Sequence, residues 1–307
     1  MTGLEALAGA AAVGVAKNAT TGALQSARDQ KREEQKALLE AAKETNEFKT
    51  AARIKGNKMA VKEALGLIIM KPLAGIMGIS REYFETNFAE DYASKIANVP
   101  EESLQTPKAS IAGPAFEGLA YSLDEPALKE MYLELLARAS DERFATSAHP
   151  SFVQIIRELT TAEALYLPRY LRSANLMTPI VQYRALFQPS HGSRVLITNV
   201  LDIQGADGIP LVDPMIPTYV DNWVRLKLVS TDYASPLVAE GTYGWAETRP
   251  ERMAAQAQLD ADRTPEFEEL LTQRGIQSIE VDCNKGHMAS TNFGHQFAQV
   301  VGMLPRP

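Results

Sequence analysis

The stretch SLDEPALKEMYLELLARA, residues 122–139, carries the clearest secondary-structure signal in the sequence. Its large apolar residues recur at intervals of three or four, which places them on one face of a helix. Ser122 and Glu125 have the spacing of a capping box, and Pro126 suits the first helical turn. The stretch therefore predicts an amphipathic core helix that ends near Ala139, with the following buried face: Leu128, Met131, Tyr132, Leu135 and Leu136.

The regions on both sides of this helix are also helical in pattern. Upstream, residues 80–97 show helical spacing, and residues 109–121 are typical of a packed helix that begins at Pro114. Downstream, Thr160 and Glu163 form a second capping-box candidate, which predicts that another helix opens there. The middle of the chain is therefore expected to be a helical domain.

Beyond about residue 171 the composition shifts toward strands and turns. Asn284-Lys285-Gly286 interrupts an apolar stretch in the way that a hairpin turn does. The β-branched run at 195–201 indicates a strand, and the segment 204–208, which contains Gly and Asp, indicates a turn. We expect a strand at 195–201, a turn at 204–208, a short helix leading into a strand at 219–229, a short helix at 264–274, a two-stranded hairpin at 276–289, and a final helix capped by Thr291.

This order of elements, helices followed by a hairpin and a terminal helix, resembles a winged-helix plan. Many winged helices read DNA with a basic recognition helix. The corresponding segment offers only Arg225 and Lys227 within an acidic part of the chain, so we favour protein interaction over nucleic-acid binding. The predicted fold is mainly α with an α+β part, in three regions: 1–58, an Ala/Gly-rich start and charged helical arm; 59–159, a central helical domain; and 160–307, a winged-helix-like α+β domain.

Composition is that of an ordinary globular protein, but the charge is unevenly distributed. The 307 residues carry a formal net charge of −7, a length that suggests about two domains. Residues 1–80 hold 12 Lys or Arg against 8 Asp or Glu, whereas the remainder holds 19 against 30. A mildly basic amino-terminal region therefore precedes an acidic body, and such a region can approach an anionic surface.

The amino-terminal region has three parts of different character. Residues 1–24 are rich in Ala and Gly, and residues 25–58 intersperse Lys, Arg and Glu at helical spacing. Residues 59–79 are the most hydrophobic stretch, but Lys71 and Pro72 interrupt it, which argues against a transmembrane helix. Two interpretations stay open for this stretch: a pair of buried core helices, or an element that contacts a membrane without crossing it.

Few residues suggest catalysis or metal binding. The sequence has no GxSxG, GxxxxGK[ST], HExxH or CxxC motif, and its four His are dispersed. Cys283 cannot form an internal disulfide, and its spacing to His287 and His295 matches no standard zinc pattern. We expect Cys283 to be a small core residue and His149 to order a helix start. We therefore expect no enzyme activity, no catalytic residue, no metal and no cofactor.

Several pieces of the sequence together resemble the Abi-alpha family, a bacterial group associated with abortive infection. They include SKIANVP at 94–100, IAGP at 111–114 with Glu117, the apolar face of residues 128–136, and HPSFV at 149–153. The segment from Ile279 to Phe297 also resembles the carboxyl-terminal strand and turn of the family, through Thr291, Gly294 and Phe297. The resemblance implies a cytoplasmic bacterial antiphage protein, and it carries over no catalytic residue.

Our leading hypothesis is a non-enzymatic antiphage defence protein that acts through self-association or membrane contact of its amino-terminal region. Its partner would be itself, another protein of the same defence system, or an anionic membrane, with a location in the cytoplasm or on the inner face of a membrane. A sensor or scaffold subunit that binds a protein or phage component is the alternative, and a nucleic-acid-binding regulator is the second alternative. The candidate contact residues are Leu4, Leu7, Val13, Lys17, Lys31, Arg32, Lys36, Leu65, Ile68 and Ile69.

Overall fold

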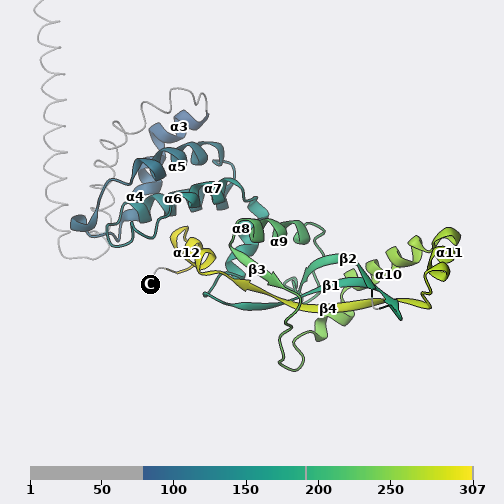
Figure 1. The fold of residues 1–307 in the computed structure, drawn as a ribbon. Helices are drawn as coiled ribbons and strands as arrows, with labels where there is room; N and C mark the ends of the chain where they lie inside the picture. Colours follow the sequence, from purple (N-terminus) through teal and green to yellow (C-terminus); the bar gives the residue numbers. More distant parts are fainter. Residues whose placement is uncertain (1–78, 191, 306–307) are drawn as a thin grey trace, which may run out of the picture.

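Figure 1 shows the computed structural model, which describes residues 79–190 and 192–305. A helical layer forms one end of the molecule, and a long curled antiparallel sheet with flanking helices forms the other. The helical layer contains α3 (Ile79–Thr86), α4 (Phe88–Ile96), the 3-10 helix η2 (Glu101–Ser103), α5 (Ala109–Tyr121), α6 (Pro126–Ala139) and α7 (Ser151–Arg157).

Helix α6 is the centre of the helical layer, as its sequence pattern predicts. It packs against α4, α5, α7, α8 (Thr161–Tyr166) and α12 (Asn292–Val300). The predicted face is buried, and Leu133 and Ala137 are buried as well, because the helix is surrounded on several sides. Gly118 of α5 lies against the ring of Tyr132, where an added Cβ would come within 2.4 Å of the ring, so the close approach of α5 and α6 requires glycine.

Two details of the predicted helix starts are wrong. Helix α5 begins at Ala109 rather than at Pro114, which lies inside it; the buried residues on both sides of Pro114 hold the helix together despite the missing N–H group. Ser122 does not cap α6, because its hydroxyl donates to the carbonyl of Gly118 at 3.0 Å and so helps to end α5. Glu125 is the N-cap residue of α6 and makes no side-chain capping bond.

The capping box at Thr160 is confirmed. The Thr160 hydroxyl accepts the backbone N–H of Glu163 at 3.2 Å, and the Glu163 carboxylate accepts the backbone N–H of Thr160 at 2.8 Å. Helix α8 then continues into the 3-10 helix η3 (Leu167–Arg169). Thr291 likewise caps the final helix, since its hydroxyl accepts the N–H of Gly294 at 2.8 Å.

The sheet has four antiparallel strands in the order β2-β1-β4-β3. They are β1 (Met177–Gln188), β2 (Gly192–Leu201), β3 (Val229–Asp232) and β4 (Ser278–Ser290). Strand β2 confirms the strand expected at 195–201. The remaining elements are α9 (Ile216–Arg225), the 3-10 helix η4 (Gly244–Thr248), α10 (Pro250–Asp262) and α11 (Pro265–Gln273), of which α9, β3 and α11 match predicted elements.

The predicted hairpin at 276–289 is wrong, because this segment is the single strand β4. Strand β1 pairs with β4 along its whole length, and Asn284, Lys285 and Gly286 face Gln182, Val181 and Ile180 in that register. Strand β3 covers the other edge from Ser290 to His287. The backbone pairing of these three residues with β1 outweighs their local turn preference.

One hydrophobic core joins the helical layer to the sheet. It runs from Phe88 of α4 through Leu135 and Phe152 to Trp223 of α9, Met288 of β4 and Phe297 of α12. A second, smaller cluster packs between the sheet and α10, around Val181, Tyr183 and Ala255. The mixed α+β fold agrees with the predicted fold class. The winged-helix assignment is not confirmed, because the segment predicted to form its hairpin, residues 276–289, is a single strand.

Within the described ranges, no helix combines the length and the apolar character needed to cross a bilayer.

Candidate functional site

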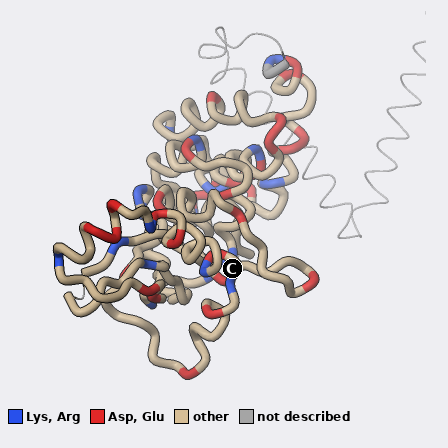
Figure 2. The backbone as a smooth tube through the Cα atoms, turned by 90° about the vertical axis from the view of Figure 1, so that its right-hand side faces the viewer, with Lys and Arg blue, Asp and Glu red and all other residues tan. Residues whose placement is uncertain are grey.

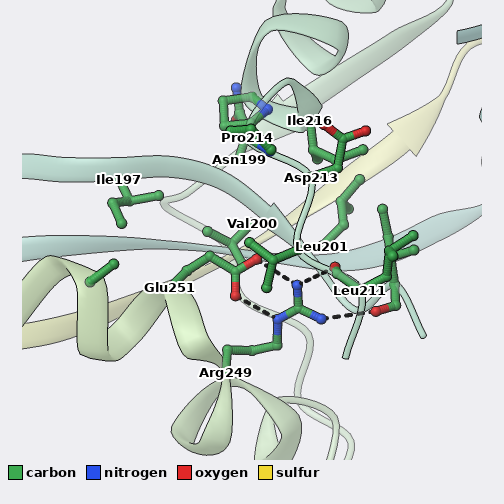
Figure 3. A pocket seen from close by; sticks show the side chains of 14 residues that line it. Ile197, Asn199, Val200, Leu201, Leu211, Asp213, Pro214, Ile216, Arg249 and Glu251 are labelled. Atoms are coloured by element: carbon green, nitrogen blue, oxygen red, sulfur yellow. Dashed lines mark hydrogen bonds and ion pairs between the residues drawn. The ribbon is translucent and has the colours of Figure 1, made fainter. Parts of the chain in front are cut away.

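A cavity of about 270 Å³ opens between β2, the start of α9, the start of α10 and the loop of residues 202–215 (Figure 3). Its walls are mainly aliphatic, and we call it the β2–α10 pocket. The aliphatic side chains that line it include Ile197, Val200, Leu201, Leu211, Val212 and Ile216. Small-molecule sites in proteins measure roughly 300–1,000 Å³, so this cavity lies below the lower end of that range.

An irregular stretch of β2 shapes one wall of the pocket. Val181 of β1 faces Val200, whereas Tyr183 faces Ile197, so β2 has one residue more than β1 between these pairs and forms a bulge. Asn199 in the bulge has a φ of 53°, a backbone region that Asn tolerates better than most residues. Its amide donates to Asp221 at 2.8 Å and accepts from the Tyr233 hydroxyl at 3.0 Å. The bulge is therefore fixed by side chains from α9 and from the end of β3.

The loop of residues 202–215 forms the second wall and exposes several apolar side chains. A backbone hydrogen bond closes the loop: the N–H of Leu211 donates to the carbonyl of Ile203 at 2.9 Å. Gly208 has a φ of 75° at the turn, as the predicted turn at 204–208 requires. Side chains along the loop remain substantially exposed: Ile209 62%, Leu211 43%, Val212 48% and Met215 45%. A run of exposed aliphatic residues beside an apolar cavity is typical of an interaction surface.

Arg249 holds this loop against the start of α10 (Figure 3). Its guanidinium donates to the carbonyls of Ile203 and Leu211, each at 2.9 Å. The same group pairs with both carboxylate oxygens of Glu251, at 2.9 Å and 2.5 Å. Because Arg249 is only 2% exposed and its donors are engaged by these partners, it positions the pocket wall and is poorly placed to receive a ligand.

The surroundings of the pocket are acidic. Residues 195–224 contain Asp202, Asp207, Asp213 and Asp221 and no Lys, Arg or His. Asp213 lines the pocket; its carboxylate accepts the N–H of Met215 at 2.9 Å and the hydroxyl of Tyr166 at 3.5 Å. In residues 79–190 and 192–305, no Lys or Arg forms an ion pair with Asp213. The pocket therefore presents an apolar floor with an unneutralised carboxylate at its edge.

A second, more polar cavity of about 310 Å³ lies at the end of α6. Arg143 pairs with Asp141 through two hydrogen bonds of 2.9 and 2.6 Å, and both Arg138 and Arg143 lie over the ring of Phe144. The hydrogen bonds from Arg143 lower the pKa of Asp141 below its usual value. Asp141 is 3% exposed, and the pair joins the end of α6 to the turn that follows. We interpret this cluster as structural.

The basic residues predicted as weak nucleic-acid contacts lie at the end of α9. Arg225 pairs with Glu158 at 2.5 Å and also donates to the side-chain oxygen of Asn222, at 2.6 Å from Nη2. Lys227 is exposed and has a φ of 61°, in the turn between α9 and β3. Figure 2 shows basic and acidic positions interspersed through the helical part of the chain. All ten predicted partner or membrane contacts, from Leu4 to Ile69, lie outside the described residues.

The structure does not bring Cys283 and the His residues together. Cys283 and His287 lie four residues apart on β4, which separates them by roughly 13 Å in an extended strand. The Cys283 thiol is half-buried, and burial raises its pKa, so its reactive thiolate form is disfavoured. His295 bonds to the carbonyl of Leu171 at 3.0 Å. No group of three or more metal-ligating side chains gathers anywhere in the part of the chain that the structure describes.

His149 has the role that its sequence context predicts. Its Nδ1 accepts the backbone N–H of Ser151 at 3.2 Å and lies 2.6 Å from the Ser151 hydroxyl, at the start of α7. Its ring also contacts Phe152 and Phe293. The imidazole therefore orders the start of α7 and ties it to α12.

Sequence reasoning missed the β2–α10 pocket entirely. Its walls come from β2, a loop, α9 and α10, and Arg249 is 38 residues or more from the carbonyls that it binds. One local signal was present: DIQGADGIPLVDPMIP at 202–217 combines aliphatic residues with three Asp and no other charge. A loop with that composition is unusually apolar for a surface connection.

Comparison with protein families gives one match. The family model described as abortive infection alpha matches residues 80–301, which is well over half of the chain and includes every element that forms the pocket. Comparisons with curated proteins and with solved structures give no significant match. The chain belongs to the abortive infection alpha family.

Proposed function

We propose that this protein is an antiphage defence protein of the abortive-infection type that acts by binding a protein partner at the β2–α10 pocket. The family match supports the biological role. The observation that carries the molecular role is the pocket itself, an aliphatic cavity of about 270 Å³ bordered by the exposed side chains of Leu211 and Val212.

Binding accounts for the chemistry of the pocket better than catalysis does. Its cation, Arg249, is paired with Glu251 and with two backbone carbonyls, so both charged groups serve the wall. Its other carboxylate, Asp213, lies at the edge beside aliphatic side chains. Aliphatic side chains of a partner would gain free energy by leaving water for such a cavity, about 25 cal/mol for each Å² of apolar surface buried.

An infection experiment tests the biological role. Cells that express the protein are infected at a low and at a high ratio of phage to cells. The proposal predicts that the culture survives at the low ratio and collapses at the high ratio, with few phage released in either case. Normal phage release from infected cells at both ratios would contradict an abortive-infection role.

The pocket is tested in the same infection assay with a matched pair of variants. Leu211→Asp places a carboxylate at the edge of the cavity, where it would be desolvated by an apolar partner. Val238→Asp makes the same change at a side chain that is 99% exposed and lies outside the pocket. We expect Leu211→Asp to abolish protection and Val238→Asp to retain it. Equal protection by the two folded variants would rule out the pocket as the functional site.

We also propose that the amino-terminal region contacts a second copy or an anionic membrane, on the basis of sequence features alone. Residues 1–80 carry an excess of four positive charges, and the run from Leu65 to Met70 is uninterrupted and apolar. Each Lys or Arg that reaches an anionic surface contributes ~1 kcal/mol. Flotation of the full chain with anionic vesicles, and loss of flotation when residues 1–58 are removed, is the result expected for membrane contact. If neither protein floats, the membrane version of this proposal is wrong.

A further inference from the structure

The composition of the β2–α10 pocket restricts what can occupy it. The cavity of about 270 Å³ lies just below the typical range of small-molecule sites, roughly 300–1,000 Å³, and its walls are aliphatic. A few aliphatic side chains from a peptide segment match its size and polarity. The Asp213 carboxylate at its edge adds a second requirement, because it has no basic partner among the described residues and attracts a Lys or Arg.

One segment of the chain has this chemistry. Residues 64–71, ALGLIIMK, supply Leu65, Leu67, Ile68, Ile69 and Met70 followed directly by Lys71. The charge distribution of the whole chain agrees with this match, since residues 1–80 have an excess of basic residues and residues 195–224 contain four Asp and no basic residue. Apolar contact and charge therefore favour the same pairing.

The position of the pocket favours a segment from another copy. The described chain begins at α3 in the helical layer, whereas the pocket lies in the sheet part of the molecule, among β2, the start of α9 and the start of α10 (Figure 1). Only seven residues separate Lys71 from Ile79, and such a linker reaches at most roughly 28 Å when fully extended. The same segment of a second copy can bind the pocket without being limited by the length of this linker.

We propose that the β2–α10 pocket of one copy binds the ALGLIIMK segment of a second copy, with Lys71 beside Asp213. This inference rests on the proposed function and names its partner. The contact is head-to-tail, because the segment and the pocket are different surfaces of the same chain. Such a heterologous contact generates closed rings or open chains, according to the rotation between neighbours.

The test is the self-association of the full chain, measured by sedimentation velocity over a concentration series. Asp213→Asn keeps an oxygen that can accept the Met215 N–H and removes the charge, and we expect association to weaken several-fold. Asp213→Lys repels Lys71 and is expected to weaken it by at least roughly tenfold, and Lys71→Asp alone should do the same. Combining Asp213→Lys with Lys71→Asp restores the opposite charges and is expected to restore association.

Two results would overturn the inference. The first is a full chain that remains monomeric at every concentration tested. The second is a double variant, Asp213→Lys with Lys71→Asp, that has wild-type thermal stability but associates no better than either single variant. Val238→Asp is the control and should associate like the wild type. Failure of this inference is distinguishable from failure of the proposed function. If the chain is monomeric but Leu211→Asp still abolishes phage protection, the pocket binds a different protein; if Leu211→Asp retains protection, the proposed function itself is wrong.

Discussion

Replacing Arg249 by Met should destabilise the protein far more than replacing a typical surface arginine. The guanidinium is 2% exposed, and its loss leaves the carbonyls of Ile203 and Leu211 without that donor and Glu251 without its ion-pair partner. Breaking a buried ion pair by removing one partner costs about 3–5 kcal/mol. The Glu251 side chain retains 16% exposure and so regains some hydration, which places the expected loss near the lower end, about 3 kcal/mol.

Urea unfolding followed by the tryptophan fluorescence of Trp223, which is buried, and Trp245 measures this loss. The matched control is Arg252→Met, because Arg252 pairs with Glu247 through side chains that are 34% and 56% exposed. That pair is expected to contribute at most about 1 kcal/mol. The double variant Arg249→Met with Glu251→Leu removes the unpaired carboxylate and should recover part of the stability. If Arg249→Met cost no more than Arg252→Met, the role given to Arg249 in holding the pocket wall would be refuted.

Three further predictions concern the framework around the site. Gly294→Ala should lower the free energy of unfolding by at least about 2 kcal/mol in urea titrations, because the added Cβ would lie 2.1 Å from the carbonyl oxygen of Leu228. An unchanged free energy of unfolding would show that α12 does not pack this closely against Leu228. Thr160→Ala removes the capping hydroxyl of α8 and should cost about 1 kcal/mol in the same titration, with Thr160→Ser as the control that retains it. The hydrogen bonds from Arg143 lower the pKa of Asp141, so the stability that they contribute is present above the ordinary carboxyl pKa and is lost as pH falls through the lowered value. The difference in unfolding free energy between wild type and Asp141→Asn should therefore be largest near neutral pH and shrink below about pH 4. A difference that does not change with pH would contradict this.

Local sequence signals predicted the elements whose ends are fixed by their own residues. The capping hydroxyls of Thr160 and Thr291 act within three residues of their positions, and both were predicted from the sequence as helix caps. The apolar face of α6 follows directly from helical periodicity. In each case the deciding interaction lies within one or two helical turns, so the sequence contains it.

The errors in the sheet arose where distant partners decide the structure. The Asn284-Lys285-Gly286 triplet has a strong turn preference, but all three residues pair with the distant strand β1. Gly286 is needed there for a different reason, since an added Cβ would lie 2.4 Å from the carbonyl oxygen of Asp232. Strand β1 was not predicted, because its polar residues and Pro179 weaken the local strand pattern while its burial is supplied by β2 and β4.

The candidate site could not be predicted for the same reason. Arg249 looks like an ordinary charged residue before a helix, and only the fold brings it to the carbonyls of Ile203 and Leu211. Asp213 becomes informative only when its surroundings are known to lack a basic partner among the described residues. Charge partitioning along the sequence did separate a basic amino-terminal region from an acidic body, and that asymmetry is the basis of the proposed contact between copies.

The most direct test of the central claim is site-specific photo-crosslinking in cells that are challenged with phage. A photoreactive phenylalanine derivative is placed at Leu211, at the edge of the β2–α10 pocket, and in a parallel strain at Val238, which is 99% exposed and outside it. The account predicts a discrete protein adduct from position 211 that is absent from position 238, and mass spectrometry should locate it within residues 64–71 of a second copy. No adduct from position 211, or the same adducts from both positions, would contradict the claim that this pocket binds a protein segment.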